Sequence, residues 1–165
     1  MRLIDFPPFT SVDPGNWPGL TLLAATALLE AEGEPEDGQL AVAYVCCNRA
    51  RYHGWDLTRA ILGNDLKAYD DGRPYEIFSC WNDDYRRQVQ NRLHGMTTAM
   101  WELFYRLACA AYWKFEDDPT YGAYFYLNVE LTKQIRGGSL PAWWDVDTES
   151  DSEVVLGRHT FRRRR

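Results

Sequence analysis

The stretch from Leu20 to Ala31 constrains the fold more than any other part of the chain. Its apolar residues recur at helical spacing around most of the circumference, at Leu20, Leu22, Leu23, Ala24, Ala27, Leu28 and Ala31. A helix that is apolar on nearly every side is expected to be buried. It should end near Gly33, because Glu34 precedes Pro35 and the residue before a proline disfavours helical backbone.

The remaining sequence predicts more helices, with short strands near the end of the chain. Helices are predicted from about residue 35, over 56–62 with Asp56 as N-cap, and over 83–116 with a break near 94–95. Strands are predicted at 123–127 and 154–161, with an extended piece at 78–81. Long loops are predicted at 63–81 and 128–153. These elements predict one mainly helical α+β domain.

Length and charge limit the classes of protein to which the chain can belong. Its 165 residues are the usual size of one domain, here divided into an irregular arm (1–18), the domain (19–161) and a basic tail (162–165). The net charge of -6 argues against nucleic acid as a partner, because phosphate binding needs a basic face. The four arginines of the tail are expected to form a solvated end. The alternative is weak attachment to an anionic polymer or membrane surface.

The sequence predicts neither secretion nor membrane insertion. Asp5, Pro7 and Pro8 interrupt the N-terminus before any apolar run forms, so no signal peptide is expected. No stretch approaches the roughly 20 apolar residues of a membrane span. We therefore expect a protein that stays in the cytoplasm until another agent releases it.

The cysteines do not indicate a metal or a disulfide framework. There are four, at 46, 47, 80 and 109, without a C-x-x-C motif or a Cys/His cluster at zinc spacing. Cys46, Cys47 and Cys109 lie in apolar runs, which favours buried free thiols and a reducing compartment. The three histidines are scattered, and no nucleotide-binding or serine-hydrolase motif occurs. Neither a metal nor a cofactor is expected.

Glu30 stands out by its position in the apolar helix. It lies near the C-terminal end, where burial and the negative end of the helix dipole both disfavour the charged form of a carboxyl group. Glu32 and Glu34 add negative charge nearby. A carboxyl group that holds its proton suits a general acid at neutral pH. Spacing alone favours the other interpretation, an ordinary surface glutamate near a helix end.

The tryptophans of the two long loops allow two interpretations. Trp81 lies in the first loop, and Trp143 and Trp144 lie in the second. Flat aromatic rings pack well against sugar rings, so these three could line a groove for a glycan. The alternative is that they cap the hydrophobic core.

Four ordered motifs resemble the catalytic domain of the spore cortex-lytic enzyme (SleB-like) family and of related bacterial and phage cell-wall hydrolases. The first is Glu-Ala-Glu-Gly-Glu-Pro-Glu-Asp-Gly-Gln at 30–39, followed by a helix that reaches Asn-Arg at 48–49. The second is Phe-Ser-Cys-Trp-Asn at 78–82. The third is Asp-Pro-Thr-Tyr-Gly-Ala at 118–123, which leads into an aromatic strand and Asn128. The last is Gly-Arg-His-Thr-Phe at 157–161.

The resemblance implies a lysozyme-like, lytic transglycosylase-like domain that degrades peptidoglycan without a cofactor. It makes Glu30 the catalytic acid/base, acting between N-acetylmuramic acid and N-acetylglucosamine. Ser79, Trp81, Tyr126 and His159 are the expected substrate-binding residues of the cleft. The partner is the peptidoglycan glycan strand, and a monomer is expected. The alternatives are a muramidase that adds water and a non-catalytic wall-binding module.

Two features depart from the family pattern. The family usually has Arg where this chain has Glu32, which removes a positive charge beside Glu30 and should further favour its protonated form. The chain as written also has no leader and no separate wall-binding domain. With the arginine tail, this resembles a phage endolysin that waits in the host cytoplasm until the inner membrane is opened.

Overall fold

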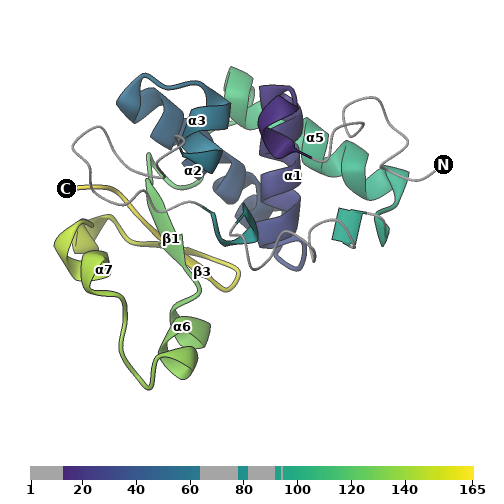
Figure 1. Ribbon diagram of the computed structural model, residues 1–165. Coiled ribbons are helices and arrows are strands. Elements are labelled where there is room, and N and C mark those ends of the chain that lie inside the picture. Colours follow the sequence, from purple (N-terminus) through teal and green to yellow (C-terminus); the bar gives the residue numbers. More distant parts are fainter. Residues whose placement is uncertain (1–12, 64–77, 82–91, 94) are drawn as a thin grey trace.

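A computed structural model describes residues 13–63, 78–81, 92–93 and 95–165 of the chain, and the following account refers to these parts. The longer helices gather on one side of the molecule and a small sheet with two short helices lies beside them (Figure 1). The helical part contains α1 (Gly19–Ala31), α2 (Glu36–His53), α3 (Leu57–Leu62) and α5 (Thr98–Trp113). The smaller part contains β1 (Phe125–Leu127), α6 (Val129–Ile135), α7 (Ala142–Val146), β2 (Val154–Leu156) and β3 (His159–Arg162). This arrangement confirms a mainly helical α+β domain.

Helix α1 is buried on every side, as its sequence predicts. Between Thr21 and Ala31 every residue is buried except Glu30. The helix packs against α2, α3 and α5, so three neighbouring helices cover its apolar surface. Its predicted end is also confirmed, because α1 stops at Ala31 and α2 begins at Glu36, directly after Pro35.

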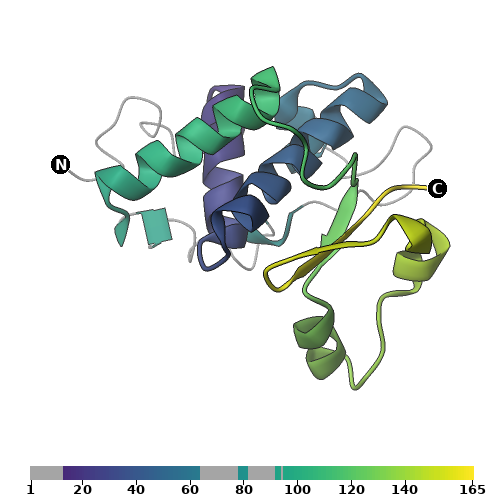
Figure 2. The same cartoon turned by 180° about the vertical axis from the view of Figure 1, so that it is seen from behind.

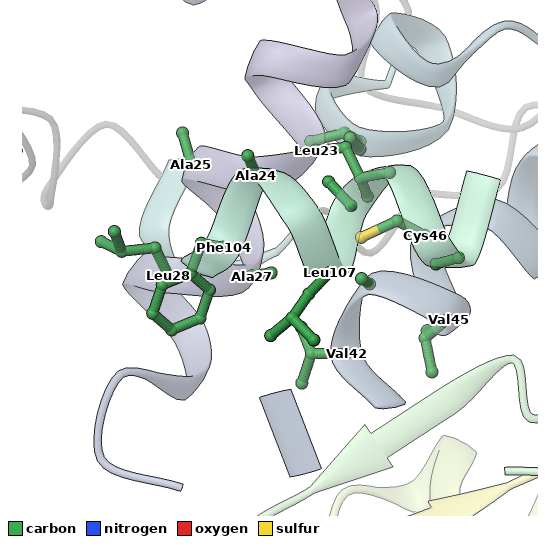
Figure 3. Close-up of a cluster of buried hydrophobic side chains, with 14 of the residues drawn as sticks. Leu23, Ala24, Ala25, Ala27, Leu28, Val42, Val45, Cys46, Phe104 and Leu107 are labelled. Carbon is green, nitrogen blue, oxygen red and sulfur yellow. The ribbon is translucent and has the colours of Figure 1, made fainter. Parts of the chain in front are cut away.

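The core lies where α1, α2 and α5 meet. In Figure 3, Ala27 of α1 lies beside Leu107 of α5, Leu28 lies beside Phe104, and Val42 of α2 lies below Leu107. Helix α2 is buried more widely than a one-faced helix, because every residue from 38 to 47 is buried. It is covered by α1, α3 and α5, and it also contacts β1 and β2. This second buried helix connects the helical part to the sheet.

The sheet has three antiparallel strands in the order β1-β3-β2. Tyr126 of β1 pairs with Phe161 of β3, and Leu156 of β2 pairs with His159. Strands β2 and β3 form a hairpin whose turn includes Gly157, with a left-handed φ of 59°. Figure 2 shows this turn beneath the start of α2. The turn of the hairpin therefore lies at the junction of α1 and α2, where the backbone N–H of Arg158 donates to Glu34.

Several element predictions differ from the structure. The piece at 78–81 is predicted as extended, but Ser79–Trp81 forms a 3-10 helix, η4. The loop predicted at 128–153 contains α6 and α7, both too short to show a helical period. The arm predicted at 1–18 includes a 3-10 helix, η3 (Pro14–Asn16), and its residues 1–12 lie outside the described residues. Asp56 is the N-cap of α3 as predicted, accepting a hydrogen bond from the N–H of Arg59.

The terminal arginines lie against the domain, which corrects the expectation of a solvated end. Arg162 belongs to β3 and pairs with Glu153 at 2.7 Å. Arg163 pairs with Glu149 at 3.2 Å. Acidic residues that precede β2 form ion pairs with the tail. The sequence does not predict these pairs, because it does not show that the two segments meet. In the described parts of the chain, no helix combines the length and apolar character needed to cross a membrane.

Candidate active site

Glu30 lies in the last turn of α1 and is the one residue between positions 21 and 31 that is not buried. Its carboxyl group accepts hydrogen bonds on both oxygens. Oε1 accepts from the Ser79 hydroxyl at 2.9 Å and from the Cys80 backbone N–H at 2.7 Å. Oε2 accepts from the Tyr126 hydroxyl at 2.8 Å. Three neutral donors from two distant segments therefore fix the orientation of this carboxyl group.

Segment η4 is held against the same face of α1 by a second contact. The indole N–H of Trp81 donates to the Thr26 hydroxyl at 2.9 Å, and that hydroxyl donates to the carbonyl of Leu22. Thr26 and Glu30 are four residues apart, so they are neighbours on one helix face. Trp81 also makes an edge contact with Trp17. These contacts fix the position from which Ser79 and Cys80 reach Glu30.

Tyr126 reaches Glu30 from β1. Its ring packs against Phe161 and lies edge-on to His159, with ring centroids 5.0 Å apart in the latter pair. Burial raises the pKa of Tyr126 well above its usual value, and the charge and hydrogen bond of Glu30 act in the same direction. The hydroxyl therefore remains protonated and available as a donor throughout the neutral pH range.

His159 is buried behind Tyr126 rather than exposed beside Glu30. Only 7% of its surface is accessible, and Nδ1 has no hydrogen-bond partner among the described residues. Burial lowers the pKa of His159, against the opposing charges of Glu34 and Glu30. The ring is thus neutral at pH 7 and supports Tyr126 by packing. Its predicted contact with substrate remains a prediction.

Glu34 and Arg158 form a second polar cluster at the junction of α1 and α2. The carboxyl group of Glu34 accepts from the backbone N–H of Arg158 at 2.8 Å and from its Nε at 2.7 Å. Burial raises the pKa of Glu34, but the two Arg158 bonds and the positive charge nearby outweigh it and hold the pKa below its usual value. The sequence predicts no role for Arg158, because nothing in it indicates that positions 34 and 158 meet.

Glu32 also has an arginine partner. Arg92 donates to Glu32 at 2.7 Å and to the carbonyl of Leu29 at 3.0 Å. The guanidinium therefore satisfies a carbonyl at the C-terminal end of α1, where a cation is favourable. From the sequence, Glu32 is predicted to remove a positive charge from the surroundings of Glu30. That expectation is corrected, because Arg92 brings a positive charge back from a distant segment.

Two of the three loop tryptophans are buried in the hydrophobic interior. Trp81 and Trp144 are 4% and 0% exposed, which favours the core-capping interpretation for both. Trp143 is partly buried and packs against Phe125. A sugar ring needs an accessible aromatic face, and Trp81 has none to offer in this arrangement. The prediction that Trp81 contacts substrate therefore has no support from its position, whereas Ser79 and Tyr126 do meet at Glu30.

The cysteines are free, as predicted, and three of the four are buried. Burial raises the pKa of Cys47 to about 12 and raises the pKa of Cys46 and Cys80 well above the usual value. These thiols therefore stay protonated and unreactive at neutral pH. No group of three potential metal ligands occurs among residues 13–63, 78–81, 92–93 and 95–165.

A pocket of about 740 Å³ lies at the other end of α1 and does not include Glu30. It is lined by Gly19 and Leu20 of α1, by Trp113 of α5 and by Trp55, which lies between α2 and α3. Its volume alone assigns it no chemistry. We place the candidate site at Glu30, where three donors from separate segments converge on one carboxyl group.

Comparison with known proteins adds an independent finding. Searches of the curated proteins and of the solved structures give no match. The model of the family described as Cell Wall Hydrolase matches residues 33–162, which is well over half of the chain. The matched range includes Ser79, Tyr126 and His159 and begins just after Glu30, so the assignment of Glu30 rests on the geometry around it. By this match, the chain belongs to the cell wall hydrolase family.

Proposed function

We propose that the protein cleaves the glycan strand of peptidoglycan between N-acetylmuramic acid and N-acetylglucosamine, as a lytic transglycosylase with Glu30 as acid and base. Membership of the cell wall hydrolase family supports action on peptidoglycan. The observation that carries the proposal is the carboxyl group of Glu30, which accepts hydrogen bonds from Ser79, Cys80 and Tyr126. A partly exposed carboxyl group held in one orientation suits proton transfer to a bound substrate.

The three donors differ in whether they allow the oxygen that they contact to carry a proton. The Cys80 N–H is a fixed donor, so Oε1 must remain an acceptor. Tyr126 bonds to Oε2 through a hydroxyl, and a hydroxyl can both donate and accept. We therefore assign the transferable proton to Oε2. This arrangement lets the carboxyl group gain or lose a proton without breaking its bond to the backbone.

The proposed reaction begins with transfer of this proton to the glycosidic oxygen. The bond between that oxygen and the anomeric carbon of the muramic acid residue breaks, which frees the 4-hydroxyl of the next sugar. The 6-hydroxyl of the muramic acid residue then attacks its own anomeric carbon and returns its proton to Glu30. No water is consumed, and one product ends in 1,6-anhydromuramic acid.

The first alternative is a muramidase that adds water at the anomeric carbon. A hydrolase that follows the usual glycosidase pattern employs two carboxyl groups across the scissile bond. The hydrogen-bond partners that the described residues give Glu30 are two hydroxyl groups and one backbone N–H. A single carboxyl group that serves as acid and then base needs no second one. The two mechanisms differ in their products, since the transglycosylase leaves anhydro ends and the muramidase leaves reducing ends.

The test is digestion of purified peptidoglycan by the wild type and by Glu30→Gln, with the products identified by mass spectrometry. The wild type is expected to release fragments with anhydro ends, which are one water lighter than reducing ends. Glu30→Gln should fold normally and lose about 10²-fold to 10⁴-fold in rate. Reducing ends alone would replace the transglycosylase with the muramidase. Equal release by both proteins would favour the other alternative, a module that only binds the wall.

A matched control comes from the same end of α1. Glu32→Gln also removes one carboxylate, but that group lies in an exposed pair with Arg92, with side-chain exposures of 35% and 47%. Exposed pairs contribute little to stability. The rate of Glu32→Gln should stay within a few-fold of the wild type, so a shared loss of activity would point to a general charge effect rather than to Glu30.

A further inference from the structure

Arg158 lies at the junction of α1 and α2 and is firmly held for a side chain so exposed. The exposed fraction of its side chain is 67%, whereas that of its partner Glu34 is 3%. The buried carboxylate accepts both the backbone N–H and Nε of Arg158. Five N–H donors belong to a guanidinium group, and Nε supplies only one of them. The four donors on Nη1 and Nη2 are not used by Glu34.

The glycines around this cluster fix where the guanidinium lies. A Cβ atom added to Gly33 would come within 2.9 Å of Nη2 of Arg158. A Cβ atom added to Gly157 would come within 2.1 Å of Oε2 of Glu34. The absence of side chains at these two positions therefore allows Arg158 to lie over the end of α1. Gly33 lies in the turn directly after α1, three positions from Glu30 in the sequence.

The charges nearby leave Arg158 as a candidate for an anion. Glu30 is followed by three glutamates at alternate positions, and an arginine pairs with each: Arg92 with Glu32, Arg158 with Glu34, and Arg106 with Glu36. The negative charge of this stretch is thus offset residue by residue. Only the Glu34 carboxylate is buried, so Arg158 is the one of the three arginines that is held by a buried carboxylate while its own side chain stays exposed.

We propose that Arg158 binds a carboxylate of the peptide stem attached to the muramic acid residue at the cleavage point. This inference rests on the proposed function. The sugars of the strand carry no ionised group, because the lactyl carboxyl group of the muramic acid residue is in amide linkage to the stem, and the anionic groups of the substrate are the stem carboxylates. Two extended residues span roughly 7 Å, so a stem carboxylate can lie well away from the bond that is cleaved. The planar guanidinium offers paired donors that match a carboxylate.

The test compares two substrates prepared from the same purified peptidoglycan: glycan strands with free stem carboxylates, and strands whose stem carboxylates have been converted to amides. Arg158→Ala should lower kcat/KM on the strands with free carboxylates by about tenfold to a hundredfold and leave the rate on the amidated strands unchanged. The control is Arg163→Ala, which also removes an exposed, paired arginine, with side-chain exposure of 50%. It should leave both rates unchanged. An equal loss on both substrates, or no loss on either, would overturn the proposal.

A second measurement avoids the destabilising effect of leaving Glu34 without its partner. The rate of the wild-type protein alone is compared on the free and the amidated strands, and it should be about tenfold to a hundredfold lower on the amidated strands. Equal rates on free and amidated stems would overturn the role of Arg158. Failure of the proposed function looks different, since the wild type would then release no glycan fragments from any of these substrates.

Discussion

The hydroxyl of Tyr126 donates a hydrogen bond of 2.8 Å to Oε2 of Glu30, although 96 positions separate the two residues in the sequence. Through this bond the small sheet contributes directly to a residue of the helical part. Ser79 and Cys80 contribute the other two donors from a different segment. The orientation of Glu30 therefore depends on the correct packing of the sheet and of η4 against α1.

Tyr126→Phe is expected to lower turnover by about tenfold to a hundredfold with little loss of stability, because it removes one donor to Glu30 and keeps the ring. Rates on purified peptidoglycan and thermal unfolding would check this. Tyr124→Phe is the matched control, since its hydroxyl bonds to His53 at 2.7 Å instead of Glu30. If both variants lose the same activity, the Tyr126 hydroxyl has no specific role.

Ser79→Ala should have a smaller effect, about threefold to tenfold on turnover, because the Cys80 N–H still donates to the same oxygen of Glu30. Combining Ser79→Ala with Tyr126→Phe should cost more than the two single losses together, since only one donor then remains. Steady-state kinetics of the two single variants and the double variant measure this coupling. Ser139→Ala, which removes a hydroxyl bonded to the Arg136 carbonyl, is the control. If the loss of rate in the double variant equals the sum of the two single losses in free energy, Ser79 and Tyr126 do not act together on Glu30.

Glu34→Gln is expected to destabilise the protein at pH 7 by about 2 kcal/mol, because the buried carboxylate loses two charge-assisted hydrogen bonds. Its pKa is lower in the folded protein than the unfolded value of roughly 4.3. The stability it contributes is therefore fully present above the unfolded value and is lost as pH falls through the folded pKa. Denaturant unfolding at pH 7 and below pH 4 should show the difference from wild type shrinking at low pH.

The control for that pH dependence is Glu36→Gln. Glu36 also pairs with an arginine, but its side chain and that of Arg106 are 58% and 55% exposed. Its substitution should change the free energy of unfolding by less than about 1 kcal/mol at either pH. A pH-independent cost at Glu34 would show that its packing, and not its charge, stabilises the junction.

Gly157→Ala should be more destabilising than Gly54→Ala by about 2 kcal/mol, because the added Cβ would displace a buried, charged hydrogen-bonding group. Both glycines have left-handed backbone, with φ of 59° and 66°. The cost of that conformation for alanine is therefore common to the two variants. Nothing lies within 4 Å of a Cβ added to Gly54, whereas the one added to Gly157 meets Glu34. Denaturant unfolding of both variants measures the difference, and equal losses would contradict the steric argument.

The sequence predicts best those features that depend on neighbouring residues. The buried helix α1, its end before Pro35 and the cap of α3 all follow from local patterns, and the structure confirms them. The family resemblance was also correct at the level of the family. Helices α6 and α7 were missed, because five or seven residues carry too little periodicity.

The site was only partly predictable, for a related reason. Ser79 and Tyr126 were expected in the cleft, and both reach Glu30. The partnerships of Arg158 with Glu34 and of Arg92 with Glu32 were not expected. Such pairs depend on where distant segments meet, which one sequence does not encode in any local pattern. The terminal arginines show the same effect, since their acidic partners come from the segment before β2.

The attachment of η4 to α1 has a consequence for how this protein would respond to heat. Trp81 binds Thr26, and the two residues before it hold Glu30. Cys80 and Trp81 belong to the hydrophobic core, so the packing that stabilises the helices also holds η4 in place. Loss of that packing would remove two donors from Glu30 at the same time. Heating should therefore abolish activity and unfold the helical core over the same range of temperature.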